Sequence, residues 1–237
     1  MSMLSISGAR LPPDLTDICD AFLLPVTLSV PDVTGEPIVY ANPPFEYLTG
    51  ASLTDVLGRN LSMFDGSLTD EQLSQDARGA ISQCQRDATC NISYRTDWTP
   101  FYHLTAFQPL NLPEHEVLVM SCHAAFAPFE QTEFTTESAK GLHRAWRDIR
   151  HFRKPETLSL NDQDLMRLDA ISMRFDAVFT RAQNALIKHI SSNIARSSQH
   201  FSPDRSSGMV LHPTQQVRNT SLDSLNLGPL SKPRTRA

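Results

Sequence analysis

Cysteines are the side chains of this sequence best suited to nucleophilic, redox or metal-binding chemistry. They are Cys19, Cys84, Cys90 and Cys122. They form no C-x-x-C pair and no ligand spacing with histidine, so the sequence predicts neither a metal site nor a disulfide framework. We expect four free thiols, buried in the folded protein and kept reduced.

Motifs of the common catalytic classes do not occur. We find no G-x-S-x-G, no P-loop and no H-E-x-x-H. The acidic pair Asp162 and Asp164 stands at the start of an expected helix, where it stabilises the helix dipole without any catalytic role. We therefore predict no catalytic residue and no enzymatic activity.

Charge and hydropathy limit the kinds of partner. The chain has 237 residues, 40% of them hydrophobic, and a net charge of -5, which suits one globular domain with an appendage. This charge gives no general attraction to nucleic acid or to an anionic membrane. There is no charged N-terminal start followed by an apolar run, and no apolar run of about eighteen residues. We expect a cytoplasmic protein, with neither a membrane nor a nucleic acid as partner.

Alternating apolar residues predict five strands. Leu24, Val26, Leu28 and Val30 have the period of two that is typical of a strand, and "PIVYA" follows after a "TGEP" turn. Short helical segments come next, the last of them within "TDEQLSQDARGAISQCQRD". Three further strand candidates are "TCNISYRTD", "TPFYHLTAFQPL" and "HEVLVMSCHAAF". This order predicts an α+β fold, a five-stranded antiparallel sheet with short helices on one face, followed by C-terminal helices.

The C-terminal third has helical periodicity. We expect one helix that ends before Pro155 and a much longer helix over about 161–198. Apolar residues of the long helix recur at spacings of three and four, which is typical of a seam for another helix. They are Leu168, Ile171, Phe175, Val178, Ala182 and Leu186. Because this helix would be about 60 Å long, longer than the domain before it, we expect part of the seam to form a homodimer.

These patterns divide the chain into four parts. We expect an N-terminal extension over 1–20, a sensory domain over 21–129, a helical hairpin or coiled-coil-like region over 136–198, and a disordered tail over 199–237. A domain followed by two helices is also the layout of a histidine kinase dimerisation region. His123, His143, His151 and His189 lie in no phosphoacceptor box, and the tail is too short for an ATP-binding domain.

Residues from about Phe22 to Phe126 resemble a PAS domain of the light-oxygen-voltage (LOV) subclass, and are most similar to short bacterial LOV proteins. The resemblance rests on "IVYANPPFEYLTG", "VLGRN" and "YRTDWTPFYHLT". A LOV domain holds a flavin through a G-x-N-C-R-F-L-Q segment, an arginine on the next helix, two strand asparagines and a final glutamine. Its cysteine forms an adduct with the excited flavin.

The resemblance assigns six pocket positions in this chain, most of them changed. Asn60 is retained, and Arg78 stands where the phosphate-binding arginine belongs. Leu61 replaces the adduct cysteine. The remaining positions are Ser93 and His103 in place of the asparagines, and Ser121 near the glutamine. Without a thiol at Leu61 no adduct can form there, and the lost amides remove about 1 kcal/mol each of hydrogen bonding to a flavin. We expect weak or no flavin binding.

We therefore expect a non-catalytic sensory protein, in which a LOV-like PAS module controls helix-mediated dimerisation or the binding of a protein partner in a signalling pathway. Two alternatives stay open. One is the sensor or phosphotransfer-adaptor half of a histidine-kinase-type system, and the other is a flavin-binding photoreceptor without the adduct cysteine. His103 itself is either a ligand-contacting group or a core histidine with a satisfied partner.

Overall fold

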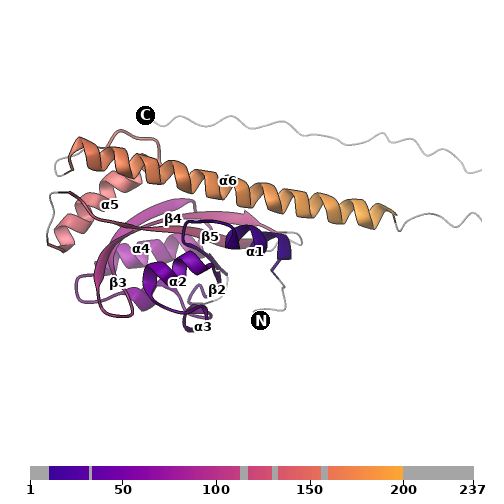
Figure 1. Ribbon diagram of the computed structural model, residues 1–237, viewed down its shortest axis with the longest axis horizontal. Coiled ribbons are helices and arrows are strands. Elements are labelled where there is room, and N and C mark those ends of the chain that lie inside the picture. Colours follow the sequence, from indigo (N-terminus) through magenta and orange to yellow (C-terminus); the bar gives the residue numbers. More distant parts are fainter. Residues whose placement is uncertain (1–10, 32–33, 113–116, 130–132, 156–159, 200–237) are drawn as a thin grey trace, which may run out of the picture. The chain divides into compact units, whose positions relative to one another are not determined.

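Five strands form one antiparallel sheet in the computed structural model of this chain (Figure 1). The structure describes residues 11–31, 34–112, 117–129, 133–155 and 160–199, with side chains as far as residue 192. The order across the sheet is β2-β1-β5-β4-β3. The strands are β1 (Val26–Ser29), β2 (Ile38–Ala41), β3 (Asp87–Tyr94), β4 (Pro100–Asn111) and β5 (Val117–Phe126). The predicted α+β class and five-stranded sheet are confirmed.

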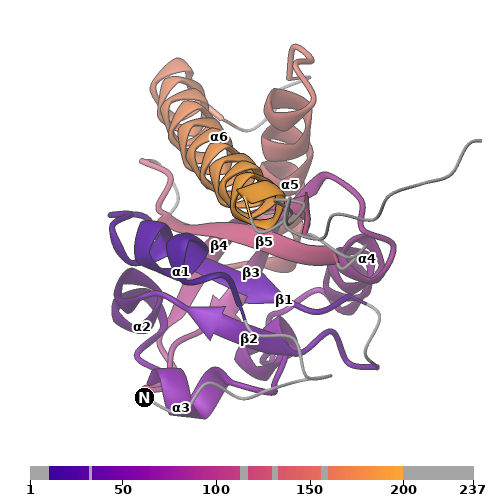
Figure 2. The same cartoon turned by 90° about the vertical axis from the view of Figure 1, so that its right-hand side faces the viewer.

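Helices cover both faces of the sheet (Figures 1 and 2). On the face that we call inner lie α2 (Pro43–Thr49), α3 (Leu53–Val56), the 3-10 helix η1 (Leu61–Phe64) and α4 (Glu71–Ser82). On the outer face lie α1 (Pro13–Asp20), α5 (Thr136–Arg150) and α6 (Asp162–Gln199).

The alternation of side chains along β4 shows why both faces are buried. Leu104 and Ala106 belong to the outer core, whereas the intervening His103 and Thr105 line a cavity on the inner face, together with Phe107. All five are buried. Successive residues of a strand point to opposite faces of the sheet, and here helices cover both faces. The polar side chains of β4 that point to the inner face are therefore buried as well.

Asn42 ties the start of the fold together. Its Oδ1 caps α2 by accepting the N–H of Phe45 at 3.3 Å and also accepts the N–H of Val26 at 2.8 Å. Its Nδ2 donates to the carbonyls of Cys19 and Leu24 at 3.0 and 2.9 Å. One fully buried amide thus satisfies backbone groups of α1, β1 and α2, which is the condition for burying it.

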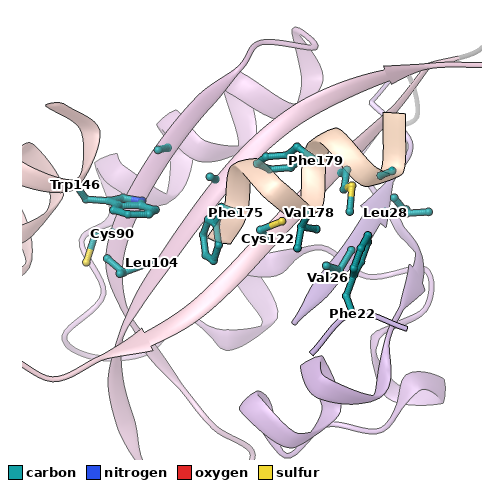
Figure 3. Close-up of a cluster of buried hydrophobic side chains, with 14 of the residues drawn as sticks. Phe22, Val26, Leu28, Cys90, Leu104, Cys122, Trp146, Phe175, Val178 and Phe179 are labelled. Atoms are coloured by element: carbon teal, nitrogen blue, oxygen red, sulfur yellow. The ribbon is translucent and has the colours of Figure 1, made fainter. Parts of the chain in front are cut away.

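α5 and α6 pack on the outer face through aromatic side chains (Figure 3). The indole Nε1 of Trp146 donates to the carbonyl of Thr105 at 3.0 Å, and its ring meets Phe175 edge to face at 5.5 Å. Arg150 donates to the carbonyl and hydroxyl of Ser172, both at 3.0 Å, and pairs with Asp176 at 3.0 Å. Such a buried guanidinium needs these partners, so α5 and α6 are held to each other as well as to the sheet.

The apolar stripe of α6 lies against the sheet of its own chain, which corrects the prediction that it is a seam for a second chain. Five of its six residues are buried, in one cluster with Val26, Leu28 and Cys122 of the sheet, and Ile171 is partly buried. Figure 3 shows Phe175 and Val178 pointing toward the strands. The buried residues are Leu168, Phe175, Val178, Ala182 and Leu186.

The predicted domain limits stay predictions. Part of the predicted extension, residues 1–10, and the predicted tail from residue 200 onward lie outside the described residues. Within the extension, α1 contacts α6, and Leu15 and Cys19 belong to the outer core.

Candidate functional site

A small cavity lies between the inner face of the sheet and the helices η1 and α4. Its volume is about 40 Å³, which is room for about three water molecules at roughly 10–15 Å³ of accessible volume each. Five of the six predicted pocket residues line it: Asn60, Leu61, Arg78, Ser93 and His103. The resemblance assigned these five residues to one pocket, and their roles in it stay predictions.

The two predicted anchors, Asn60 and Arg78, are engaged within the chain. Asn60 Nδ2 donates to the carbonyl of Gly35 at 2.9 Å, and its Oδ1 accepts the N–H of Ser62 at 3.1 Å and the Ser62 hydroxyl. Arg78 Nε donates to a Glu36 carboxylate oxygen at 3.1 Å. Both partners of this ion pair line the cavity, so the arginine at its edge already has a carboxylate where a phosphate would bind.

A buried chain of hydrogen bonds crosses four strands beside the cavity. The Ser93 hydroxyl and His103 Nδ1 are 3.0 Å apart. His103 Nε2 and His123 Nδ1 are 3.1 Å apart, and His123 Nε2 lies 3.0 Å from the Thr27 hydroxyl. We call these four residues the polar chain. It joins β3, β4, β5 and β1 and satisfies each imidazole on both of its nitrogens.

Burial keeps both histidines of the polar chain neutral. Desolvation, with a smaller effect of Arg95, lowers the pKa of His103 to about 4. Desolvation and the neighbouring His103 lower the pKa of His123 well below its usual value. A neutral imidazole donates from one nitrogen and accepts on the other, so the polar chain has two consistent directions of donation. It can reverse its polarity without moving a heavy atom.

Ser121, the sixth predicted residue, lies outside the cavity lining. It is fully buried on β5, opposite Thr27 and Phe107 in the neighbouring strands. Among the buried side-chain polar atoms of the described residues, its hydroxyl oxygen is the one without a hydrogen-bond partner. Such an orphan is costly and needs an explanation.

None of the cysteines lines the cavity. Burial raises the pKa of Cys19 to about 12. It also raises the pKa of Cys90 and Cys122, which belong to the core on the outer face of the sheet (Figure 3). A thiol held protonated is a poor nucleophile. Leu61, at the position assigned to the adduct cysteine, is partly buried and packs against the apolar clusters around Phe64 and Phe107.

These residues do not fit a flavin, the cofactor that the resemblance implies. Pockets for ligands of that size have volumes of roughly 300–1,000 Å³, against about 40 Å³ here. The amide of Asn91, which also lines the cavity, is bonded to the backbone N–H and carbonyl of Asp70 at 3.0 and 2.8 Å. Ser74 donates to Asp65 at 2.6 Å. The polar lining is thus mostly satisfied by the chain itself, and burial raises the pKa of Asp65.

The histidines considered for phosphotransfer are also engaged. His143 Nδ1 accepts the backbone N–H of Cys90 at 3.2 Å, and His189 lies 2.9 Å from an Asp14 carboxylate oxygen. His151 Nδ1 lies 2.7 Å from the carbonyl of Arg147. In the part of the chain that the structure describes, no group of three or more potential ligands could hold a metal ion, and no helix is long and apolar enough to cross a membrane.

Sequence reasoning missed half of the polar chain. His123 meets His103 because β5 pairs with β4, and Thr27 meets His123 because β1 pairs with β5. Thr27 and His123 are 96 positions apart in the chain. Their one signal was that each is a polar residue within a short, mostly apolar strand pattern.

Comparisons with known proteins agree with the resemblance. No family model matches the chain. It is 27% identical over 128 residues to a "Blue-light-activated histidine kinase 2" of Erythrobacter litoralis, covering 51% of this chain and 37% of the relative. It is 32% identical over 84 residues to "Protein TWIN LOV 1" of Arabidopsis thaliana, covering 35% of this chain and 21% of the relative. The chain thus spans little more than a third of the length of these relatives, or less.

Among the solved structures that the chain matches is the "LOV domain from Erythrobacter litoralis EL346 blue-light activated histidine kinase". The TM-score is 0.41 at 26% identity, covering 44% of this chain and 96% of that domain.

Proposed function

On the premise that the relatives of this chain are LOV-domain sensory proteins with a PAS-like fold, we propose that it is a non-catalytic signal-transduction module. It has lost flavin–cysteine photochemistry, and its output is carried by the C-terminal helices. The observation that supports this most is the cavity of about 40 Å³, which no cysteine lines and whose wall includes Ser93 and His103 of the polar chain.

Thr105 supports the proposed route from the cavity to the helices. Its side chain lines the cavity, while its carbonyl accepts the indole N–H of Trp146. Trp146 in turn contacts Phe175 of α6. A rearrangement of the inner face that shifts β4 would therefore change how α5 and α6 pack. For this route to carry a signal, the ligand or partner must bind one packing of α5 and α6 more tightly than another.

Spectroscopy of the purified full chain tests the proposal. We expect no flavin absorption band after incubation with FMN and removal of unbound FMN, and no adduct in a light-minus-dark spectrum. Leu61→Cys should behave in the same way, because it restores the thiol but neither the pocket volume nor the amide side chains that a flavin needs. Leu61→Ala is the control for the smaller side chain without a thiol. Stoichiometric FMN in the unmodified chain, or a reversible adduct in Leu61→Cys, would contradict the proposal.

The histidine kinases among the relatives favour a second candidate, the sensor or adaptor part of a phosphorelay. The exposed candidate in the described residues is His151. Incubation of the chain with radiolabelled ATP and a phosphorylated kinase partner should leave it unlabelled if the first proposal holds. Acid-labile label that disappears in His151→Ala would support the phosphorelay instead.

A further inference from the structure

A second seven-residue repeat runs along α6 on the side away from the sheet. We letter the positions a to g so that Ala170 is at a and Met173 at d. The residues that α6 buries against its own domain then fall at b, c and f: Phe175 at f, Val178 at b and Phe179 at c are buried. Positions a and d are left for the outward side, which no other described element covers (Figures 1 and 2). Positions e and g lie along its two edges, where Asp176 at g pairs with Arg150 of α5 and Arg167 at e donates to the carbonyl of Ala127.

Small and apolar residues fill most of the outward a and d positions. Met166, Met173 and Ile187 at d are 73%, 63% and 53% exposed. We call the set the outward stripe: Met166, Ala170, Met173, Ala177, Thr180 and Ile187. Asn184 continues it at a. Large exposed apolar side chains at a regular spacing mark an interaction surface, and a single asparagine at a specifies register and the number of helices in a coiled coil.

The charges beside the outward stripe are sorted by sign. Position g carries an acid in three successive heptads, at Asp162, Asp169 and Asp176. As far as the described side chains reach, position e carries bases, Arg167, Arg174, Arg181 and Lys188. In a parallel pair of helices each g residue lies beside an e residue of the other helix, so the three aspartates would each meet an arginine, and Gln183 at the fourth g position would meet Lys188. In an antiparallel pair g meets g and e meets e, which would place like charges together.

We propose that the outward stripe of α6 binds a second copy of this chain as a parallel two-helix coiled coil. The inference deepens the proposed output through the C-terminal helices by naming the partner, the helix face and the direction. The stripe predicted from the sequence could not do this, since it covers the sheet.

Asp169 and Arg174 are the pair best placed to test the direction. Both are exposed, and neither makes an ion pair with any residue that the structure describes. Other members of the set are shared with their own domain: Asp176 pairs with Arg150 at 3.0 Å, and Arg167 with Asp164 at 3.0 Å. Of the three proposed aspartate–arginine contacts between the two helices, the one between Asp169 and Arg174 is therefore the one whose two members have no ion-pair partner among the described residues of their own chain.

Sedimentation or light scattering of the full chain across a concentration series measures the dimer. We expect Met173→Asp to raise the dimer dissociation constant at least tenfold, without changing circular dichroism. Tyr47→Asp is the matched control, because Tyr47 is 91% exposed on α2 and should leave the constant unchanged. A chain that is monomeric at high micromolar concentration overturns the proposal, while the flavin spectra test the loss of photochemistry independently.

Charge exchange and cross-linking test the parallel direction. Asp169→Arg and Arg174→Asp should each raise the dissociation constant by about tenfold in low salt, since each acts twice in a symmetric dimer. The double variant restores opposite charges and should return it to within about threefold of the unmodified chain. Ala170→Cys should form a disulfide-linked dimer under mild oxidation, because a residues face each other only in the parallel arrangement. Failure of the double variant to recover, or no cross-link, overturns the parallel coiled coil.

Discussion

His103 Nε2 and His123 Nδ1 share a hydrogen bond of 3.1 Å in the middle of the sheet. Both side chains are fully or nearly fully buried. The centroids of the two rings are 5.1 Å apart, and the ring planes are tilted by 35° to each other. The polar chain ends at the hydroxyls of Ser93 and Thr27, and no carboxylate of the described residues is hydrogen-bonded to either imidazole. A proton added to either imidazole would therefore be a buried charge facing a second imidazole without a counter-ion.

Acid is expected to destabilise the fold well before the carboxylates are protonated. The pKa of His103 is about 4 in the folded chain and about 6.5 when unfolded. As pH falls through 6.5 toward 4, the unfolded chain binds protons that the folded chain does not, so the free energy of unfolding decreases. His103 alone contributes about 3 kcal/mol to this loss. His123 and His143, whose pKa values burial also lowers, add to it.

Urea unfolding at a series of pH values between 7 and about 4.5 measures this slope. His103→Gln keeps hydrogen-bonding groups at the position but cannot take up a proton. It should reduce the pH dependence, whatever its effect on stability at neutral pH. An unchanged slope would mean that the protons bind elsewhere and that His103 is not the buried neutral group that its surroundings require.

Two serines on the same face of the sheet should respond to alanine in opposite directions. Ser121→Ala removes a hydroxyl without a partner among the described residues and should raise the free energy of unfolding by about 1 kcal/mol. Ser93→Ala breaks the bond to His103 and leaves a ring nitrogen unsatisfied, so it should lower that free energy by about 1–3 kcal/mol. The urea unfolding midpoints of the two variants, compared with that of the unmodified chain, test the two predicted directions. A loss in Ser121→Ala would show that the hydroxyl has a partner in solution.

Local patterns were enough to predict the fold. β3 and β4 are joined by a short turn at Asp97 and Trp98 and pair from Asp87–Phe107 to Tyr94–Pro100, and their alternation and turn residues are adjacent in sequence. Gly50 ends α2 with a φ of 75°, a conformation that glycine adopts without strain. Such signals need no knowledge of distant contacts.

The site was predicted only as far as the resemblance reached. Asn60, Leu61, Arg78, Ser93 and His103 line one cavity, as their assigned positions imply. Their partners could not be read from the sequence. Whether Arg78 meets a phosphate or Glu36, and whether His103 meets a ligand or His123, depends on side chains that come together only in the fold.

The C-terminal helix shows a limit of periodicity. A spacing of three and four marks an apolar face but does not say whether a sheet or another helix covers it. The aromatic residues Phe175 and Phe179 suit a broad sheet surface, whereas Ala170, Ala177 and Met173 on the other side suit close helix packing. The bulkier stripe dominated the pattern, and the outward stripe was therefore missed.

Substitution of Val178 distinguishes the two stripes. Val178 is 7% exposed in the core with Val26 and Cys122. A carboxylate there would be buried without a partner, so Val178→Asp should lower the free energy of unfolding by about 3–5 kcal/mol, even in dilute samples. Met173→Asp, on the exposed side, should change it by less than about 0.5 kcal/mol under the same conditions.

Urea unfolding by circular dichroism at low micromolar concentration, where a weak dimer has dissociated, separates stability from assembly. Val178→Asp should lose sheet and helix signals together at a lower urea concentration, because α6 and the outer face of the sheet share one core. If Val178→Asp instead kept its unfolding midpoint and lost only its dimer mass, the stripe on Val178 would be open to a second chain. The packing of α6 on the sheet would then be wrong, and with it the outward stripe as the dimer surface.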